Sequence, residues 1–319
     1  MQQKVVVYRE LPDQVLYFLK NKFDVSYFPT LKDENYRDFL FELQTAHGLL
    51  GASMKIGQEL LYQAPNLKVI SNISVGYDNL NIEELKKRNI IATNTPGVLD
   101  DTTADTVFGL LLATARRMPE LDHYVKAKKW GGTKGEDLFG VDVHHKTLGI
   151  IGMGSIGRAV AKRARFGFDM EILYHNRSRN KEAESKFDAT YCSLDELLKK
   201  SDFVCLMVPH TPQTEKMIGE REFNLMKDSA IFINGSRGKN VDKEALIKAL
   251  QKKEILSAGL DVFEIEPVEK DNPLLSMPHV VTLPHIGSAT TETRAKMAKL
   301  AAENMAIALE GKTPPNLIR

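Results

Sequence analysis

A strand-like apolar run that breaks into three closely spaced glycines constrains this chain more than any other feature. The run begins at Thr147, the glycines are Gly152, Gly154 and Gly157, and a helical apolar stripe follows at once. In a strand–glycine–helix turn, the first glycine permits a tight bend, the second lets the backbone approach a pyrophosphate, and the third lets helix and strand pack closely. Free N–H groups at the helix start would face the phosphates. The pattern therefore predicts a dinucleotide site, with an ordinary glycine-rich turn as the alternative.

The next strand indicates which dinucleotide is bound. It spans Glu171 to His175, and no carboxylate stands at its end, where a cofactor without a 2′-phosphate usually has its ribose held. Arg177, Ser178 and Arg179 follow instead, and two guanidinium groups with a hydroxyl can bind a 2′-phosphate. We therefore expect NADPH to be preferred, with NADH also possible; the alternative is a solvated basic loop.

Bulk properties limit the class of protein. The chain has 319 residues, is 43% hydrophobic and 27% charged, and carries a net charge of +1. This composition is typical of a soluble two-domain protein and does not favour binding to nucleic acid or to a membrane surface. Two cysteines, Cys192 and Cys205, form neither a disulfide framework nor a metal-ligand spacing. Without a signal-peptide pattern, the sequence predicts a cytoplasmic protein with no metal site.

Alternating strand and helix patterns predict two α/β domains. Strands are expected at 4–8, 24–28, 48–51, 67–71 and 90–94, and then at 147–151, 171–175, 203–208, 230–234, 257–262 and 279–283. Helices are expected at 12–20, 34–43, 57–63, 81–87, 101–118 and 290–310, with a loop at 127–146. Asn81 and Ser193 each begin a helix-capping pattern, and Gly311 is a helix-stop residue.

The glycine motif lies near the middle of the chain, which predicts that the dinucleotide domain is inserted into the other domain. We place the dinucleotide-binding domain at 100–287 and the substrate domain at 1–99 and 288–319. Six strands in the inserted part match a complete doubly wound sheet. A small substrate is expected in a cleft between the domains.

Three chemically useful side chains follow strands of the second half. Arg237, Glu266 and His285 each come just after a buried strand, and ligands bind at the carboxyl ends of strands in such sheets. Carbonyl reduction needs a proton donor such as histidine, a carboxylate to orient it, and a cation for a substrate carboxylate. The alternatives are a strand cap or salt bridge for Arg237, a turn residue for Glu266 and a structural role for His285. Asp261 either bonds a cofactor edge or ends its strand; His175 and His210 are further candidates at the cofactor.

Together these segments resemble the D-isomer-specific 2-hydroxyacid dehydrogenases along essentially the whole chain. The matching segments are residues 75–79, 94–98, 149–157, 234–238, 259–263, 266–267 and 283–290. Within that family the chain is most similar to the glyoxylate/hydroxypyruvate reductases, including those that reduce 2-ketogluconate. The resemblance implies an α/β fold of two doubly wound parallel-sheet domains, a Rossmann domain inserted into a flavodoxin-like substrate domain. One departure is Asn81, where the family has an acidic residue; as a good N-cap, it is expected to have no functional effect.

The resemblance also implies roles for individual residues. His285 would be the acid/base, Glu266 its partner and Arg237 the anchor of the substrate carboxylate, with substrate contacts also from Ser288 and from the backbone N–H groups of Val75 and Gly76. Cofactor contacts would come from Gly152, Gly154, Ser155, Ile156, Gly157, Arg177, Ser178, Arg179, Pro209, Gly235, Asp261 and Gly287. A homodimer is implied, with residues 101–145 in its interface and Trp130 either reaching the neighbouring active site or simply packing in the interface.

The sequence therefore predicts an NADPH-preferring reductase that converts small 2-keto acids to D-2-hydroxy acids, with glyoxylate and hydroxypyruvate as the expected substrates and 2-ketogluconate as a further candidate. Formate dehydrogenases pair the histidine with glutamine, so Glu266 argues against them, and the chain's end after its last helix argues against a phosphoglycerate dehydrogenase with a regulatory extension. Two alternatives stay open. Phosphite dehydrogenases have a similar triad, and C-terminal-binding-protein corepressors use this fold as a dinucleotide sensor, although they usually carry a tail.

Overall fold

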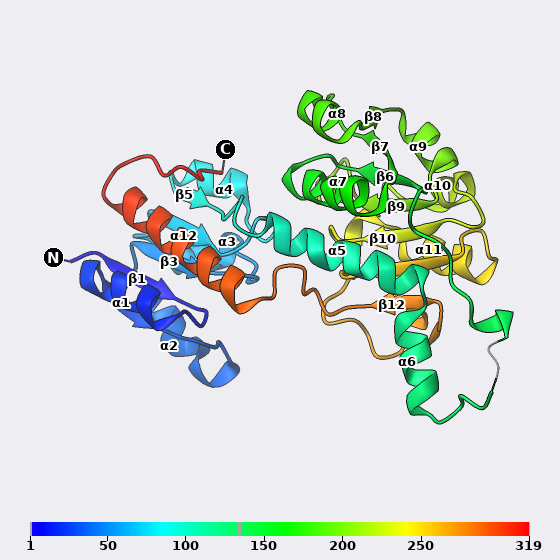
Figure 1. The fold of residues 1–319 in the computed structure, drawn as a ribbon. Coiled ribbons are helices and arrows are strands. Elements are labelled where there is room, and N and C mark those ends of the chain that lie inside the picture. The colour runs from blue at the N-terminus through cyan, green and yellow to red at the C-terminus, as the bar shows by residue number, and fades with distance from the viewer. Residues whose placement is uncertain (1, 133–134, 319) are drawn as a thin grey trace. The chain divides into compact units, whose positions relative to one another are not determined.

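The computed structural model describes residues 2–132 and 135–318 and divides the chain into two compact units (Figure 1). The first unit combines residues 1–99 with 289–319, and the second comprises Asp100–Ser288. The second unit begins at the residue expected from the sequence and ends one residue later than expected. The second unit is thus an insertion in the chain of the first.

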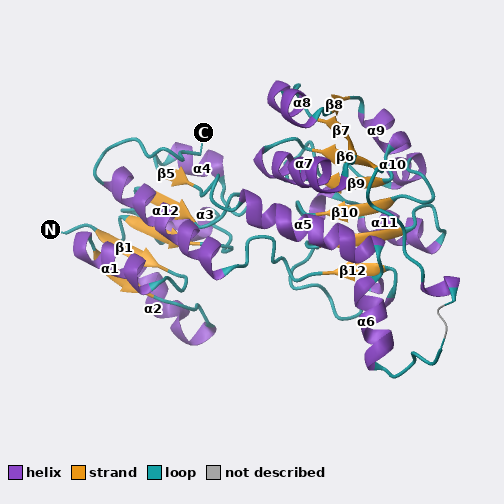
Figure 2. Cartoon of the chain, in the orientation of Figure 1, coloured by secondary structure: helices purple, strands orange, loops and turns teal. Residues whose placement is uncertain are grey.

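The first unit is a five-stranded parallel sheet with helices on both faces (Figure 2). The strand order is β2-β1-β3-β4-β5, the flavodoxin-like order. Its elements are β1 (Lys4–Val7), α1 (Asp13–Lys22), β2 (Asp24–Tyr27), α2 (Asp33–Leu43), β3 (Gly48–Gly51), α3 (Gln58–Tyr62), β4 (Val69–Asn72), α4 (Ile82–Lys87), β5 (Ile91–Thr93) and α12 (Thr291–Leu309). Because the central strands of a parallel sheet are covered on both faces, β3 and β4 are buried at every residue rather than at alternate ones.

The C-terminal helix α12 belongs to the core of this first unit. It packs on β3, β4 and β5, while α2, α3 and α4 form a separate apolar cluster with the sheet. The buried Ser71 hydroxyl donates to the Ala301 carbonyl of α12 at 2.7 Å and lies 2.9 Å from the Thr93 hydroxyl. Residues more than two hundred positions apart in the chain therefore complete one core.

The second unit is a seven-stranded, all-parallel sheet between two layers of helices (Figure 1). Its elements are α5 (Asp100–Ala115), α6 (Met118–Lys126), β6 (Thr147–Ile151), α7 (Ser155–Phe168), β7 (Glu171–His175), α8 (Lys181–Phe187), β8 (Thr190–Tyr191), α9 (Leu194–Lys200), β9 (Phe203–Leu206), α10 (Glu220–Leu225), β10 (Ile231–Asn234), α11 (Lys243–Gln251), β11 (Ser257–Leu260) and β12 (Val280–Thr282). One apolar cluster packs α5, α7 and α8 on the sheet, and another packs α9, α10 and α11.

The order of this sheet is β12-β11-β10-β9-β6-β7-β8. Counted from β6, this is the Rossmann order 3-2-1-4-5-6 with one further strand at the edge. Strands β6 to β8 follow one another toward one edge of the sheet, and β9 to β12 follow one another toward the other edge. The strand order therefore reverses between β6 and β9, which are hydrogen-bonded neighbours. Open α/β sheets bind ligands outside the carboxyl ends of their strands at such a switch point, so the glycine turn after β6 stands at the expected place.

The sequence-based outline was wrong in two places in the second unit. The sheet has seven strands rather than six, because the two-residue strand β8 pairs with β7 and is too short to show a pattern. The long helix ends at Ala115 rather than at Met118. Arg117 adopts a left-handed φ of 54°, and a new helix, α6, begins at Met118 with a proline in its first turn. That proline was the signal of a new helix start.

Three local predictions are confirmed. Asn81 and Ser193 cap α4 and α9 by accepting hydrogen bonds from the backbone N–H groups of Glu84 and Glu196. Gly311, just beyond α12, has a φ of 80°, a conformation that favours glycine. Asn81 thus has a structural role at the position where it departs from the family pattern.

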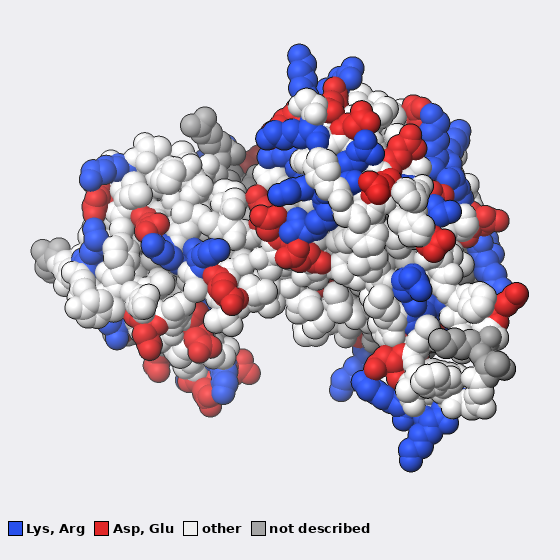
Figure 3. Space-filling model, viewed as in Figure 1, with Lys and Arg blue, Asp and Glu red and all other residues white. Residues whose placement is uncertain are grey.

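The surface carries charges of both signs. On the face seen in Figure 3, Lys and Arg lie beside Asp and Glu over α7 and α8. Ion pairs account for part of this pattern, among them Arg163 with Asp105 and Lys186 with Glu182. No helix in the part of the chain that the structure describes is long and apolar enough to cross a membrane.

Candidate active site

The glycine turn between β6 and α7 has the geometry that its three glycines predict. Gly152 has a φ of 104°, and a Cβ there would lie 2.7 Å from the Met207 carbonyl oxygen. A Cβ on Gly157 would overlap the carbonyl oxygen of Gly152, so helix and strand pack closely at this point. Gly154, by contrast, is exposed and has open space where its Cβ would be. The backbone is therefore accessible where a pyrophosphate would approach.

The first turn of α7 suits an anion. Ser155 is the first helical residue, it is exposed, and no acidic side chain lies in that turn. The unpaired N–H groups at a helix start carry partial positive charge, which attracts phosphate. Ser155, Ile156 and Gly157 thus present backbone donors without a competing carboxylate.

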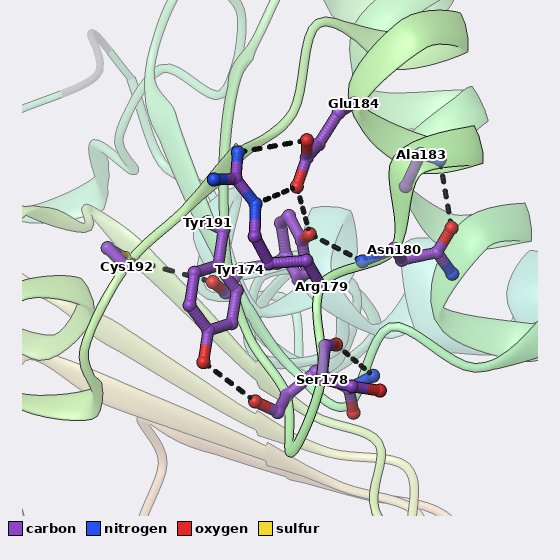
Figure 4. Close-up of polar contacts among 9 residues, drawn as sticks. Tyr174, Ser178, Arg179, Asn180, Ala183, Glu184, Tyr191 and Cys192 are labelled. Carbon is purple, nitrogen blue, oxygen red and sulfur yellow. Dashed lines mark hydrogen bonds and ion pairs between the residues drawn. The ribbon is translucent and has the colours of Figure 1, made fainter.

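Two arginines of the basic segment after β7 lie in different surroundings. Arg177 is exposed, and no ion-pair or hydrogen-bond partner for it occurs within residues 2–132 and 135–318. The Arg179 guanidinium is held by Glu184 of α8, with Nε–Oε1 and Nη2–Oε2 distances of 2.9 and 3.0 Å (Figure 4). Ser178 is exposed, and its carbonyl accepts a hydrogen bond from Asn176. The sequence did not reveal that Arg179 has a carboxylate partner.

The loops after β9 and β10 lie at the same edge of the sheet. Pro209 is exposed and precedes His210, whose Nδ1 lies 3.2 Å from the side-chain oxygen of Asn240. The fully buried Asn240 amide also donates to the Val208 carbonyl at 3.0 Å, which ties the two loops together. Gly235 is close-packed against Val107 of α5. Asn240 was not predicted, because a buried amide leaves no pattern in a single sequence.

Asp261 organises the loop that carries His285. Its carboxylate accepts hydrogen bonds from the backbone N–H groups of Ile286 at 2.8 Å and Gly287 at 2.9 Å. Burial raises the pKa of this carboxyl, and the two N–H donors act in the opposite direction. Asp261 directly follows β11, and its carboxylate binds the loop of His285. Each carboxylate oxygen already accepts one backbone hydrogen bond, so any cofactor contact would be an additional one.

His285 and Glu266 form a hydrogen-bonded pair. His285 Nδ1 lies 2.7 Å from Glu266 Oε2, and Glu266 Oε1 accepts a hydrogen bond from the backbone N–H of Phe263 at 3.0 Å. Because an ionised carboxylate only accepts, Nδ1 carries the hydrogen of this bond and Nε2 is left for a ligand. His285 has a φ of 53°, an uncommon conformation for a residue with a side chain, and its N–H donates to the Asp261 carbonyl.

The charge state of Glu266 follows from competing effects. Burial favours the neutral acid, but hydrogen bonds from His285 and Phe263 and the charges of His285 and Arg237 outweigh it, so the pKa of Glu266 is lowered. A carboxyl with a lowered pKa stabilises the fold above its ordinary pKa and loses that contribution as pH falls through the folded value. The carboxylate is therefore ionised at neutral pH and available to orient the imidazole.

Arg237 is brought beside Glu266 by the neighbouring glycine. A Cβ on Gly238 would overlap the backbone of Phe263 and Glu264, so only glycine lets the loop after β10 lie against the loop of Glu266. Arg237 is half-buried and donates from Nη1 to the Ser236 carbonyl at 2.8 Å. The structure thus brings the predicted cation, carboxylate and imidazole to one edge of the sheet; Ser288 is the last residue of this unit.

The predicted substrate contacts of the first unit lie in a separate turn after β4. The Val75 carbonyl accepts from Asn94 at 2.8 Å and the Gly76 carbonyl accepts from Asn72 at 2.9 Å. For the N–H groups of these two residues, no hydrogen-bond acceptor is found in the described part of the chain. The two asparagines thus hold the turn through its carbonyl groups. A recognisable signal in the sequence was an asparagine at each strand end, because Asn72 is the last residue of β4 and Asn94 directly follows β5.

Comparison with known proteins identifies the family. A model of the NAD binding domain of the D-isomer specific 2-hydroxyacid dehydrogenases matches residues 108–287. Glyoxylate/hydroxypyruvate reductase B of Klebsiella pneumoniae is 50% identical over 318 residues, covering 100% of this chain and 98% of that protein. The chain belongs to the D-isomer specific 2-hydroxyacid dehydrogenase family. As a member of this family it is an oxidoreductase, in agreement with the resemblance of its motifs.

Solved structures that are similar to this chain have the same fold. A protein from Thermus thermophilus is 39% identical with a TM-score of 0.91, covering 99% of this chain and 100% of that one. An NADPH-dependent glyoxylate/hydroxypyruvate reductase from Sinorhizobium meliloti, in complex with NADP and malonate, is 29% identical with a TM-score of 0.87, covering 100% and 97%.

Replacing Gly238 by alanine should separate the loops of Arg237 and Glu266. The added methyl has no room against the backbone of Phe263, so we expect a loss of about 1–3 kcal/mol in the free energy of unfolding. The matched control is Gly167→Ala in α7, where a Cβ meets nothing within 4 Å. Thermal and urea unfolding of both variants would check this, and equal stability of the two would contradict it.

Proposed function

We propose that this enzyme reduces small 2-keto acids, such as glyoxylate and hydroxypyruvate, to D-2-hydroxy acids with NADPH. The observation that carries the proposal is the 2.7 Å pair of His285 and Glu266 beside Arg237 at the ligand-binding edge of the second sheet. The names of the Klebsiella and Sinorhizobium relatives, both glyoxylate/hydroxypyruvate reductases, support the substrate class.

Each residue of this group supplies one requirement of the reaction. When bound, the nicotinamide supplies the hydride, and the remaining chemistry is electrostatics and proton transfer. Glu266 accepts the hydrogen bond from Nδ1–H of His285 and so orients the ring, and the protonated ring can donate its Nε2 proton to the developing alkoxide. Arg237 can bind the substrate carboxylate and polarise the adjacent carbonyl. We also expect the free N–H groups of Val75 and Gly76 to bind a carboxylate.

The residues present fit a phosphorylated dinucleotide. The accessible backbone at Gly154 and the acid-free first turn of α7 suit a pyrophosphate, and the exposed Arg177 suits a 2′-phosphate. Ser178 would add a hydroxyl donor to the same phosphate. The Sinorhizobium relative was solved with NADP, which supports the same preference here.

A homodimer is the second part of the proposal. Four large apolar side chains of α6 and of the segment that follows it are strongly exposed. Their exposed fractions are 52% for Met118, 49% for Val125, 59% for Trp130 and 60% for Phe139. Helix α6 has no buried residue at all. Such a surface is typical of a protein interface, and a second copy of the chain would bury it symmetrically.

The function is tested by following oxidation of NADPH and NADH with glyoxylate, hydroxypyruvate and 2-ketogluconate. We expect turnover with NADPH to exceed that with NADH, and the order of the substrates to show whether the site accepts the longer 2-ketogluconate. Cofactor binding without turnover of any keto acid would overturn the substrate assignment in favour of phosphite oxidation or dinucleotide sensing.

Changing His285 to alanine should lower kcat by about 10²–10⁴, the usual contribution of acid–base catalysis. NADP⁺ affinity should change little, because the variant removes a proton donor rather than a phosphate contact. His144→Ala is the control, since that histidine is well exposed and 3.8 Å from its nearest carboxylate. Undiminished turnover in His285→Ala would remove this residue from the mechanism.

Changing Arg177 to alanine should raise the KM for NADPH about tenfold or more and leave that for NADH nearly unchanged, because only NADPH carries the 2′-phosphate. Arg165→Ala, which removes a half-buried arginine of α7 paired with Asp188, is the control. Equal losses for both cofactors would place the 2′-phosphate elsewhere.

Sedimentation velocity should give twice the mass of one chain for the wild type, and Val125→Asp should shift it toward the monomer, because a buried unpaired charge opposes association. Phe166→Asp serves as the control, being 67% exposed on α7 and outside the proposed interface. A monomeric wild type would exclude the dimer.

A further inference from the structure

Glu184 is a carboxylate placed beside the segment proposed to bind the 2′-phosphate, yet the family roles discussed above give it no function. Its side chain is 23% exposed, whereas the side chain of its partner Arg179 is 64% exposed. Arg179 therefore covers Glu184 from the solvent side, with the Tyr191 ring 5.8 Å from the guanidinium. The Glu184 carboxylate lies beneath the Arg179 guanidinium, so substitution of Arg179 would expose the carboxylate to solvent.

Tyr174 holds Glu184 in place independently of Arg179. The Tyr174 ring is fully buried under α8, and its hydroxyl donates to Glu184 Oε1 at 2.6 Å (Figure 4). The same hydroxyl accepts a hydrogen bond from the Asn180 N–H at 2.7 Å. Asn180 in turn donates from its side chain to the carbonyl of Met153, inside the glycine turn, at 2.9 Å. A continuous set of hydrogen bonds thus links the glycine turn to Glu184.

Glu184 is ionised at neutral pH. Hydrogen bonds from Arg179 and then from Tyr174 lower its pKa, and burial only partly opposes them. The charge matters because Rossmann domains that bind ribose without a 2′-phosphate carry an acidic side chain at the end of the second strand, and Arg179, the partner of Glu184, lies in the segment that follows that strand. An uncovered Glu184 would repel a phosphate bound at that segment, because like charges repel.

We propose that Arg179 makes NADPH acceptable by neutralising Glu184, while Arg177 is the cation that contacts the 2′-phosphate. The bidentate pair uses the Nε and Nη2 edge of Arg179 and cancels one negative charge beside the site. Glu184 is then a specificity-determining residue whose effect is suppressed in the wild type. The inference rests on the proposed preference for NADPH.

Masking and direct contact predict different results for the same pair of variants. If Arg179 only neutralises Glu184, removing both charges together restores a neutral surrounding and with it NADP⁺ affinity. If Arg179 bonds the phosphate itself, the double variant stays as weak as Arg179→Ala alone. A double-mutant cycle therefore separates the two roles.

The experiment measures equilibrium binding of NADP⁺ and NAD⁺ by calorimetry, without substrate, to the full-length wild type and its variants. We expect Arg179→Ala to weaken NADP⁺ binding about tenfold, Arg179→Ala/Glu184→Gln to return to within about threefold of the wild type, and Glu184→Gln alone to bind NADP⁺ at least as well as the wild type. NAD⁺ affinity should stay within about twofold throughout, which also shows that each variant is folded.

Glu182 supplies a matched control on the same helix. It lies two residues before Glu184, its carboxylate pairs with Lys186 at 2.9 Å, and Glu182→Gln removes the same charge from α8. Arg179→Ala/Glu182→Gln should remain as weak for NADP⁺ as Arg179→Ala, because Glu182 does not pair with Arg179. Equal recovery in the two double variants would mean a general charge effect and would overturn the specific role of Glu184.

Further outcomes are equally decisive. A double variant as weak as Arg179→Ala, or an Arg179→Ala variant with unchanged affinity, overturns the masking role. The proposed cofactor preference is judged separately, by comparing NADP⁺ with NAD⁺ in the wild type and by Arg177→Ala. A wild type that binds NADP⁺ and NAD⁺ equally would refute the cofactor preference, whereas the masking role of Arg179 is decided by the double-mutant cycle. A wild type that does not bind NADP⁺ would overturn both the preference and the masking role.

Discussion

The hydrogen bonds that Asp261 makes to the loop of His285 are the interaction on which the candidate active site depends. The Asp261 carbonyl accepts from the N–H of His285, and its carboxylate accepts from the next two N–H groups. These three bonds hold His285 in a left-handed conformation that a residue with a side chain rarely adopts. The imidazole is thereby directed toward Glu266. The backbone strain at His285 is offset by the hydrogen bonds that the buried Asp261 accepts from this loop.

The same principle, a polar group held by a buried partner, recurs at each part of the site. Asn240 joins the loops after β9 and β10, Asn72 and Asn94 hold the turn of Val75 and Gly76 in the first unit, and Tyr174 holds Glu184. Asn72, Asn240 and Tyr174 are buried, whereas Gly76, His210 and Glu184, which they hold, are half-buried. Fixed surroundings reduce the freedom that must be lost when a ligand binds.

Much of the fold followed from patterns along the chain. Apolar runs after short turns predicted eleven of the strands within a few residues, and the glycine motif predicted the turn after β6, because both signals are local. The two-residue strand β8 and the break between α5 and α6 were missed. The first is defined only by pairing with β7, and the second by a left-handed residue, Arg117, that is an arginine rather than a glycine.

The sequence by itself determined the family, the α/β fold class and the identity of the side chains that can perform the chemistry, because these depend on residue types in a fixed order. Only the tertiary structure decided how those side chains are paired. Arg177 and Arg179 are two positions apart and look equivalent in the sequence, yet one is exposed without a partner in the described chain and the other covers Glu184. That difference arises because Glu184 of α8 pairs with Arg179 and is itself held by the Tyr174 hydroxyl, and residue types in a sequence do not specify which side chains meet in this way.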